Sequence, residues 1–305
     1  MRYSQVIGPG RSEVVEAPDP APGEGQVRVA VSACGLCASE RTGWARHGGG
    51  EPTRYGHEVT GRIEELGPAA YGWRVGDLVT GLGDPGYADQ MVMKANAILP
   101  VPPNVAPEHA LGEPLACLVE ALSRTPVGPR DRVAIVGLGF MGLGILQLTR
   151  LLGPAALVAV DLEKGARETA LALGATEAYH PDEVPTEYRS GMTVVIEAAG
   201  TAGALATAGE LTAQHATLCI VGYHASGPRT MDLDLWHKGV DIINGYTPQR
   251  HRIMAAMARG LELIAQRRFS YEPLITHRLG LAEVDTGFGY FADRPAGFIK
   301  SVVIP

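Results

Sequence analysis

The sequence predicts an α/β protein with two domains, in which a doubly wound parallel sheet is inserted into a β domain of irregular connectivity. The chain has 305 residues, more than one hydrophobic core usually takes. Residues 1–110 are rich in short β-type runs separated by Gly, Pro and Asp. From Asp131 onward, continuous apolar runs alternate with helix-like segments, which is typical of a parallel sheet buried on both faces.

The N-terminal region predicts several short strands and then a helix. The β-type runs are QVRVAVSA, EVTGRIEEL, DLVTGL and YADQMVMK. The proline-bearing segment LPVPPNVAPEHAL predicts a connector, and EPLACLVEALSRT, which follows it, has helical spacing. This part of the chain is therefore expected to be an all-β domain that ends in a helix.

The middle of the chain predicts alternating strands and helices, and the tail becomes β-like again. The expected strands are RVAIVG, ALVAVD, MTVVIEAAG, ATLCIVG and VDIING; the expected helices include GLGILQLTRLLG, KGARETALALGAT and RIMAAMARGLELIAQRR. Because the tail from residue 274 shows the same short β-type runs as the N-terminal region, we expect the chain to return to the first domain. The predicted domains are 1–117 with 257–305, and 118–256.

Composition excludes several classes of partner. Apolar residues make up 46% of the chain and the net charge is −7, with no Lys/Arg run, which argues against nucleic acid or an anionic membrane as a partner. No apolar run has the length of a signal peptide or a membrane span. Four cysteines do not make a disulfide framework. We expect a soluble, cytoplasmic protein.

A glycine motif predicts a dinucleotide site. Gly137-x-Gly139-x-x-Gly142 follows a predicted strand and opens a helix. Gly137 permits a tight turn, Gly139 lets a pyrophosphate approach the backbone, and Gly142 lets the helix lie close to the strand. The helix N-terminus, at Phe140 and Met141, offers backbone N–H groups to the phosphates.

The next predicted strand ends at Asp161, 19 residues beyond Gly142. Its carboxylate would accept hydrogen bonds from the adenosine ribose and repel a 2′-phosphate. Leu162 follows, and no Arg is immediately adjacent, so NAD is favoured and NADP is the less favoured cofactor. Lys164 is the residue most able to reverse that preference.

A cluster of potential metal ligands lies in the first domain. The Cys34-x-x-Cys37 pair stands in a β context, which disfavours a thioredoxin-type redox pair, and a structural zinc knot lacks further cysteines nearby. A catalytic zinc site needs fewer protein ligands, and Cys37 with His57 and Glu58 is such a set. From the residues alone, a buried cysteine and a surface His-Glu pair remain an equal alternative.

Several segments together resemble the zinc-dependent medium-chain dehydrogenase family, in its sorbitol and polyol dehydrogenase branch. They are CGLCASE, GHEVTGRIEELGPAA, WRVGDLV, GEPLACLVEA, PLITHRLGL and GFIKSVVIP, which span essentially the whole chain. The resemblance implies a GroES-like catalytic domain plus a Rossmann domain, and an NAD-dependent alcohol or polyol dehydrogenase. It also implies a small-molecule alcohol substrate and a homodimer or homotetramer.

The resemblance also implies roles for individual residues. Cys37 and His57 are zinc ligands, Glu58 is the third ligand in sorbitol dehydrogenase-like members, and Glu113 ligates directly or through the zinc-bound water. Ser39 matches the hydroxyl that binds the substrate oxygen and begins the proton relay. In the implied reaction, an alcohol held at zinc loses its proton through Ser39 and passes hydride to the nicotinamide.

Two further matches and three departures from the family pattern bear on this site. Lys300 matches a basic position near the cofactor pyrophosphate, and Cys117 is expected to face the nicotinamide side. No cysteine lobe for a structural zinc follows GDLVTGL, so one zinc ion per subunit is expected. Thr42 stands where a relay histidine is usual, so the proton would pass through Ser39 with Thr42 or water. Glu40 replaces the usual Asp.

The substrate is expected to be a polyol, a sugar or a cyclitol with a secondary hydroxyl. Trp44, His47, Tyr87 and His224 are candidates to line its pocket, His47 is a candidate substitute in the proton relay, and Trp236 is expected at an interface or in the core. Two alternatives remain: a zinc-free medium-chain reductase of quinones or enones, and a non-catalytic NAD-binding protein.

Overall fold

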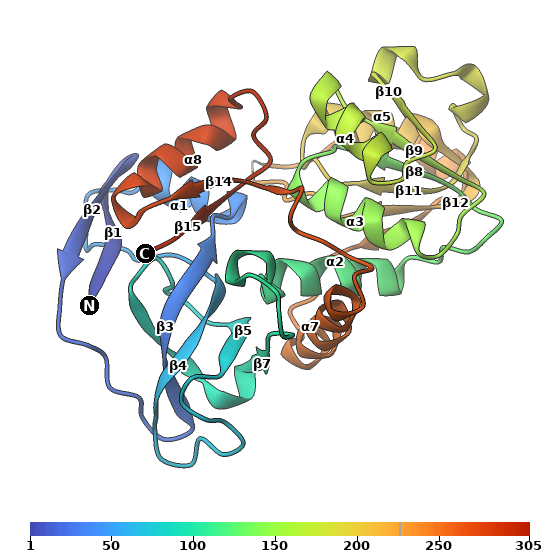
Figure 1. Cartoon of the computed structure of the whole chain (residues 1–305). Helices are drawn as coiled ribbons and strands as arrows, with labels where there is room; N and C mark the ends of the chain where they lie inside the picture. The colour runs from blue at the N-terminus through green and yellow to red at the C-terminus, as the bar shows by residue number, and fades with distance from the viewer. Residues whose placement is uncertain (226) are drawn as a thin grey trace. The chain divides into compact units, whose positions relative to one another are not determined.

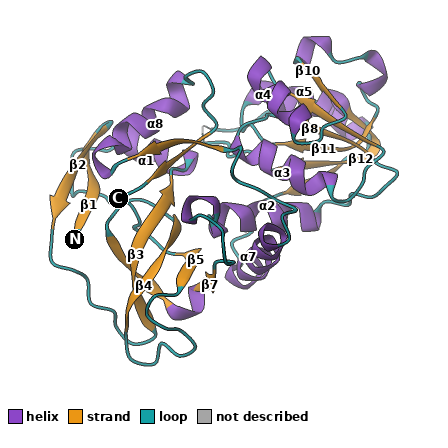
Figure 2. Ribbon diagram, viewed as in Figure 1, coloured by secondary structure: helices purple, strands orange, loops and turns teal. Residues whose placement is uncertain are grey.

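Two different sheets account for most of the strands. The computed structural model describes residues 1–225 and 227–305. Within these residues the chain divides into two units, Met1–Ala116 with Met257–Pro305, and Cys117–Ala256. The first carries a mainly antiparallel sheet and the second a parallel sheet, which confirms the predicted α/β class (Figures 1 and 2).

The first unit is built mostly from short strands. Its strands are β1 (Arg2–Gly8), β2 (Arg11–Glu16), β3 (Gln26–Gly35), β4 (Glu58–Leu66), β5 (Leu78–Leu82), β6 (Gln90–Lys94), β7 (Ile98–Pro100), β14 (Ile275–Leu279) and β15 (Lys300–Val303). Its helices are α1 (Ala38–Ala45) and α8 (Val284–Asp293), with 3₁₀ turns at Ala95–Ala97, Pro107–His109 and Leu281–Glu283. Helices α2 (Gly112–Arg124) and α7 (Arg250–Ala265) each contain a boundary between the units.

Alternating burial explains the sheet of this unit. Among the described residues, the strand order is β14-β15-β3-β4-β5-β7, with β6 also paired to β3. Val27, Val29 and Val31 of β3 are buried while the residues between them are less so, as expected for a strand with one face on the core. Strands β3 and β4 run antiparallel and place Gly35 opposite Glu58.

The tail differs from the sequence prediction. Residues 274–305 were expected to be β-like, but they contain helix α8 between β14 and β15. Glycines and aromatic residues, which favour turns and strands, disguise this helix in the sequence. Packing overrides the propensity, because Val284, Gly287 and Phe288 at helical spacing are buried, and a Cβ on Gly287 would lie 2.7 Å from both Leu36 and Leu279.

The second unit alternates strands and helices, as predicted. Its strands are β8 (Arg132–Val136), β9 (Ala156–Val160), β10 (Glu177–Tyr179), β11 (Met192–Glu197), β12 (Thr212–Ile220) and β13 (Asp241–Asn244). Its helices are α3 (Phe140–Arg150), α4 (Lys164–Ala172), α5 (Ala202–Leu211) and α6 (Leu233–His237), with 3₁₀ turns at Pro181–Glu183 and Thr186–Tyr188.

In the part of this unit that the structure describes, all paired strands are parallel, in the order β10-β9-β8-β11-β12-β13. The chain starts in the middle at β8, builds outward to β10, and then returns to build from β11 to β13. Helices α3, α4 and α5 pack against strands β8, β9 and β11 (Figure 2). The strand order therefore reverses between β8 and β11, the position where doubly wound sheets bind ligands.

A search of the described residues finds no helix that is both long enough and apolar enough to cross a membrane.

Candidate metal centre and cofactor site

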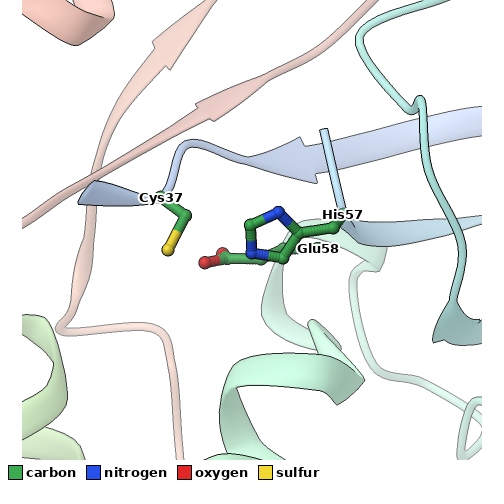
Figure 3. A group of neighbouring side chains, drawn as sticks. All are labelled: Cys37, His57 and Glu58. Atoms are coloured by element: carbon green, nitrogen blue, oxygen red, sulfur yellow. The ribbon is translucent and has the colours of Figure 1, made fainter. Parts of the chain in front are cut away.

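Three potential metal ligands meet where β3 ends and β4 begins. Cys37 follows β3 by two residues, while His57 immediately precedes Glu58, the first residue of β4. The ligand atoms of Cys37, His57 and Glu58 all lie within 4.8 Å of one another (Figure 3). Gly35 makes this possible, because a Cβ there would lie 2.0 Å from Glu58 Oε2. The antiparallel register thus brings together residues that are 20 positions apart in the sequence.

Helix α1 holds His57 in place through Glu40. The sequence prediction contained no helix directly after Cys37, yet α1 begins there and buries the Glu40 carboxylate. Glu40 Oε1 lies 2.7 Å from His57 Nδ1 and accepts a hydrogen bond from the Gly56 N–H at 2.8 Å. The Tyr87 hydroxyl donates to Glu40 Oε2 at 2.5 Å. A carboxylate that accepts the Nδ1 proton leaves Nε2 for a metal, which is the common arrangement at metal-bound histidines.

The electrostatics of His57 follow from these neighbours. Burial lowers its pKa, but hydrogen bonds to Cys37 and Glu40 and their negative charges outweigh burial and raise the pKa of His57 to about 12. The site without metal therefore favours a positive charge at the place where three ligand atoms converge.

A second positive charge comes from Lys300. Its Nζ lies 2.6 Å from Glu58 Oε2 and donates to the Leu36 carbonyl oxygen at 2.7 Å, and both charged side chains are buried. Burial lowers the pKa of Lys300, but the charge of Glu58 above all, and then that of Cys37, raises it overall. The structure thus places Lys300 beside a potential metal ligand, whereas the expected contact with the cofactor pyrophosphate stays a prediction.

The predicted proton-relay residues lie on helix α1. The Ser39 hydroxyl donates to Cys37 Sγ at 3.2 Å, so it borders the cluster. Thr42 follows Ser39 by three residues and shares its helix face. Glu113 begins the first turn of α2 and is half-buried. Its charge contributes to raising the pKa of Lys300, although the three-ligand cluster found among the described residues does not include Glu113.

The other candidates in this unit have structural contacts. Trp44 stacks on Phe288 at 5.3 Å between ring centroids and donates to Asp285 at 2.7 Å. His47 is half-buried, and its Nε2 lies 3.1 Å from the Glu51 carbonyl oxygen. Tyr87 is 2% exposed and supports Glu40 from the core, so it is no part of an open pocket wall. The sequence carried no signal for this contact, because Tyr87 lies 47 residues after Glu40.

The glycine turn of the second unit has a separate physical reason for each glycine. Gly137 has φ +93°, a left-handed conformation that favours glycine. A Cβ on Gly142 would lie 1.8 Å from the Gly137 carbonyl oxygen, whereas one on Gly139 would meet nothing within 4 Å. Helix α3 begins at Phe140, followed by Met141, and its N-cap residue Gly139 has no side chain that could cap the first N–H groups. The open space at Gly139 is where an anionic ligand can approach the backbone.

Asp161 follows β9 and closes this turn. Its Oδ2 accepts from the Leu138 N–H at 2.6 Å and its Oδ1 accepts from the Glu163 N–H at 2.9 Å. Lys164, the residue expected to be most able to favour NADP, is on the surface, where its Nζ lies 3.6 Å from Glu168. Arg167 was missed: its Nη1 donates to the carbonyl oxygens of Asp161 and Leu162, both at 2.8 Å. Arg167 lies in the first turn of α4, six residues after Asp161, so adjacency in the sequence does not reveal the contact.

Comparison with known proteins agrees with this geometry. Residues 23–103 match the family "Alcohol dehydrogenase GroES-like domain", and residues 141–262 match "Zinc-binding dehydrogenase". The chain is 25% identical to a sorbitol dehydrogenase of Halalkalibacterium halodurans, over 98% of this chain and 97% of the relative. It is 31% identical to a Mycobacterium tuberculosis protein named "Probable zinc-binding alcohol dehydrogenase Rv1895", over 75% of this chain and 70% of that protein.

A solved structure from Sinorhizobium meliloti, bound to NADP, has a TM-score of 0.85 at 24% identity and covers 100% of this chain and 99% of its own. Its likeness supports the fold, a GroES-like domain with a Rossmann-type domain. The chain belongs to the zinc-type medium-chain dehydrogenase family. It is accordingly a dehydrogenase that acts on CH–OH groups, in a family that uses a metal and a nicotinamide cofactor.

Proposed function

We propose that the chain is a zinc-dependent dehydrogenase that transfers hydride between NAD and the secondary alcohol of a polyol, sugar or cyclitol. The observation that carries the proposal is the convergence of Cys37, His57 and Glu58 within 4.8 Å, with His57 anchored by Glu40. In this proposal, residues 1–117 with 257–305 hold the metal and residues 118–256 hold the cofactor.

The donor set fits zinc. Thiolate, imidazole and carboxylate are the ligand types of zinc sites, and a catalytic site uses three protein ligands and keeps one position open. His57 is already oriented through Nδ1, as a metal ligand needs to be. We propose Glu113, half-buried in the first turn of α2, as a further ligand, directly or through water, as the family resemblance implies. We expect one zinc ion per subunit.

The residues around the cluster suit proton transfer from an alcohol. When bound, zinc would supply a Lewis acid that stabilises negative charge on the substrate oxygen, and NAD would accept the hydride. The Ser39 hydroxyl donates a hydrogen bond to Cys37 Sγ in this structure. It is the group proposed to accept a hydrogen bond from the substrate hydroxyl and to pass on its proton. Thr42, on the same face of α1, is the proposed next member of the relay, in place of the usual histidine.

NAD is the proposed cofactor, with Gly137, Gly139, Phe140, Met141, Gly142 and Asp161 as its binding residues. The Asp161 carboxylate would bind ribose hydroxyls and repel a 2′-phosphate. Arg167 is an observation in favour of NADP, because its guanidinium lies against the Asp161 carbonyl oxygen. A direct comparison of NAD and NADP as hydride acceptors decides between them.

We further propose a homodimer or homotetramer. Strand β13 is an edge of the parallel sheet as described, and Trp236, Ile242 and Tyr246 around it are exposed. Trp236 is 76% exposed, which excludes the core and favours the interface of the two placements expected from the sequence. Light scattering of the purified chain tests this assembly.

The deciding experiment measures zinc content by elemental analysis and NAD reduction with a panel of polyols, aldoses, inositols and amino-cyclitols. The similarity to a sorbitol dehydrogenase supports starting with polyols. One zinc per chain and turnover of a secondary alcohol are expected. Zinc-free protein that reduces enones, or tight NAD binding without turnover of any alcohol, would overturn the proposal.

A variant tests the fourth ligand. Glu113→Gln should lower zinc affinity by about 10-fold or more if the carboxylate ligates or orders a bound water. Glu108→Gln is the matched control, because Glu108 lies nearby in sequence and pairs with Arg278 at 3.3 Å. Unchanged zinc content and activity in Glu113→Gln would remove Glu113 from the site.

A further inference from the structure

Three side chains form a hydrogen-bonded chain at the carboxyl end of the parallel sheet, and the proposed mechanism does not use them. Glu197 is the last residue of β11, while His224 and Arg229 lie in the loop after β12. Glu197 Oε2 lies 2.9 Å from His224 Nε2, and Arg229 Nε lies 2.8 Å from His224 Nδ1. The Glu197 side chain is 0% exposed.

The partners fix the protons of this chain. An arginine Nε can only donate, so His224 Nδ1 accepts, and Nε2 therefore carries the ring proton and donates it to Glu197. The other Glu197 oxygen, Oε1, accepts from the N–H groups of Ala199 at 2.8 Å and Gly200 at 2.7 Å. The imidazole is thus a bridge of defined polarity between a buried carboxylate and a guanidinium.

The chain joins two loops that are pressed together. Val221 and Gly222 donate their N–H groups to the Glu197 carbonyl oxygen at 2.8 and 3.0 Å. A Cβ on Gly222 would lie 2.3 Å from Gly200 N and 2.6 Å from Glu197 Oε2. Residues 198–200 and 221–224 are therefore packed closely against each other. The hydrogen bonds from His224 to Glu197 and from Arg229 to His224 hold this arrangement from its outer side.

The position of these loops in the sheet says what they border. A doubly wound sheet binds a dinucleotide across the point where the strand order reverses, with one half of the ligand on each side. Asp161 after β9 belongs to the adenosine half, so the ends of β11 and β12 belong to the nicotinamide half. A Cβ on Gly137 would lie 2.6 Å from Ala199 Cβ, so the loop held by Glu197 begins directly beside the phosphate turn.

We propose that Glu197, His224 and Arg229 are positioning residues for the nicotinamide ring of the cofactor. They hold residues 198–200 and 221–224 in the shape that this ring meets, and they act on the ADP-ribose part of the cofactor little or not at all. The inference rests on the proposed function, because it requires a nicotinamide dinucleotide in this unit.

The test compares NADH with ADP-ribose, which lacks the nicotinamide, by calorimetric titration of the full chain. Removing a hydrogen bond to a charged group costs enough to raise the NADH Kd of His224→Ala about tenfold, while the ADP-ribose Kd should stay within about twofold. His224→Gln should recover most of the NADH affinity, because its amide can donate to Glu197 and accept from Arg229. If the three residues had a purely structural role, the substitutions would weaken the binding of NADH and of ADP-ribose equally.

Arg229→Leu keeps the inference testable if His224→Ala does not fold, since it leaves the hydrogen bond between His224 and Glu197 in place. It should raise the NADH Kd about threefold and leave that of ADP-ribose unchanged, because only one of the two hydrogen bonds of His224 is lost. Equal weakening of the two ligands, or no change in either, overturns the inference. A wild-type chain that binds neither ligand overturns the proposed function instead.

Discussion

The metal cluster and the glycine turn are specified by the chain in different ways. The turn is local: three glycines within six residues satisfy three separate backbone requirements. The cluster is assembled from β3, α1, β4 and β15, and its side chains depend on one another through Glu40 and Lys300. A local site tolerates change outside its own few residues, whereas an assembled site is sensitive to residues far away in sequence.

The largest expected effect is on the assembled site. Lys300→Met removes the cation beside Glu58 and leaves a buried carboxylate without its ion pair. The metal-free protein should lose about 3–5 kcal/mol of unfolding free energy, the usual result of breaking a buried pair on one side. Urea unfolding with and without added zinc measures this. Zinc should stabilise the variant more than the wild type, and equal stabilisation would contradict the pairing described here.

The local site offers a matched pair of substitutions with opposite outcomes. Gly142→Ala places a methyl group against the Gly137 carbonyl oxygen and should cost about 1–3 kcal/mol of stability, as overpacking does. Gly139→Ala meets no atom within 4 Å and should leave the unfolding midpoint unchanged while weakening NADH binding. Thermal unfolding and NADH titration of both variants check this. A stable Gly142→Ala variant would show that helix α3 can move away from the turn.

A smaller effect is expected one step away from the metal ligands. Glu40→Gln keeps the size of the side chain but removes the charge that accepts the His57 Nδ1 proton, so zinc affinity should fall about 10–100-fold. Glu40→Asp keeps the charge, so its zinc affinity should fall less than that of Glu40→Gln. Competition with a chelator measures both affinities, and unchanged binding in Glu40→Gln would show that His57 is oriented without this carboxylate.

The smallest effect is expected at Tyr87. Tyr87→Phe removes one hydrogen bond to Glu40 and should lower the unfolding free energy by about 1 kcal/mol. It should also alter the visible spectrum of the cobalt-substituted protein, because Glu40 transmits the change to His57, a proposed metal ligand. Tyr55→Phe is a suitable control: it too borders the α1 region, but no hydrogen bond from its hydroxyl to Glu40 is observed among the described contacts. An unaltered cobalt spectrum in Tyr87→Phe would separate Tyr87 from the metal centre.

The sequence allowed prediction of features whose signals are local. The parallel sheet, the glycine turn and the α/β class follow from apolar runs and glycine spacing. The prediction of a β-like tail was wrong where helix α8 lies. Gly287 is there for close packing against Leu36 and Leu279, a tertiary reason that overrides propensity. Helix α1, which positions Glu40 and Ser39, was likewise absent from the prediction.

The supporting contacts of both sites could not be predicted, because they join residues far apart in the chain. Tyr87 reaches Glu40 across 47 residues, His224 reaches Glu197 across 27, and Lys300 reaches the Leu36 carbonyl oxygen across 264. No periodicity or spacing rule encodes such pairs. The residue types supplied Cys37, His57 and Glu58 as ligand candidates, and the resemblance added Glu113, but only the folded chain shows which side chains hold them.

The ammonium of Lys300 gives Glu58 a counter-ion that belongs to the chain itself, so the charge of this buried carboxylate is balanced inside the fold. In the proposed site, loading the metal would be a change of cationic partner for Glu58. Such a centre would lend itself to ion replacement under native conditions.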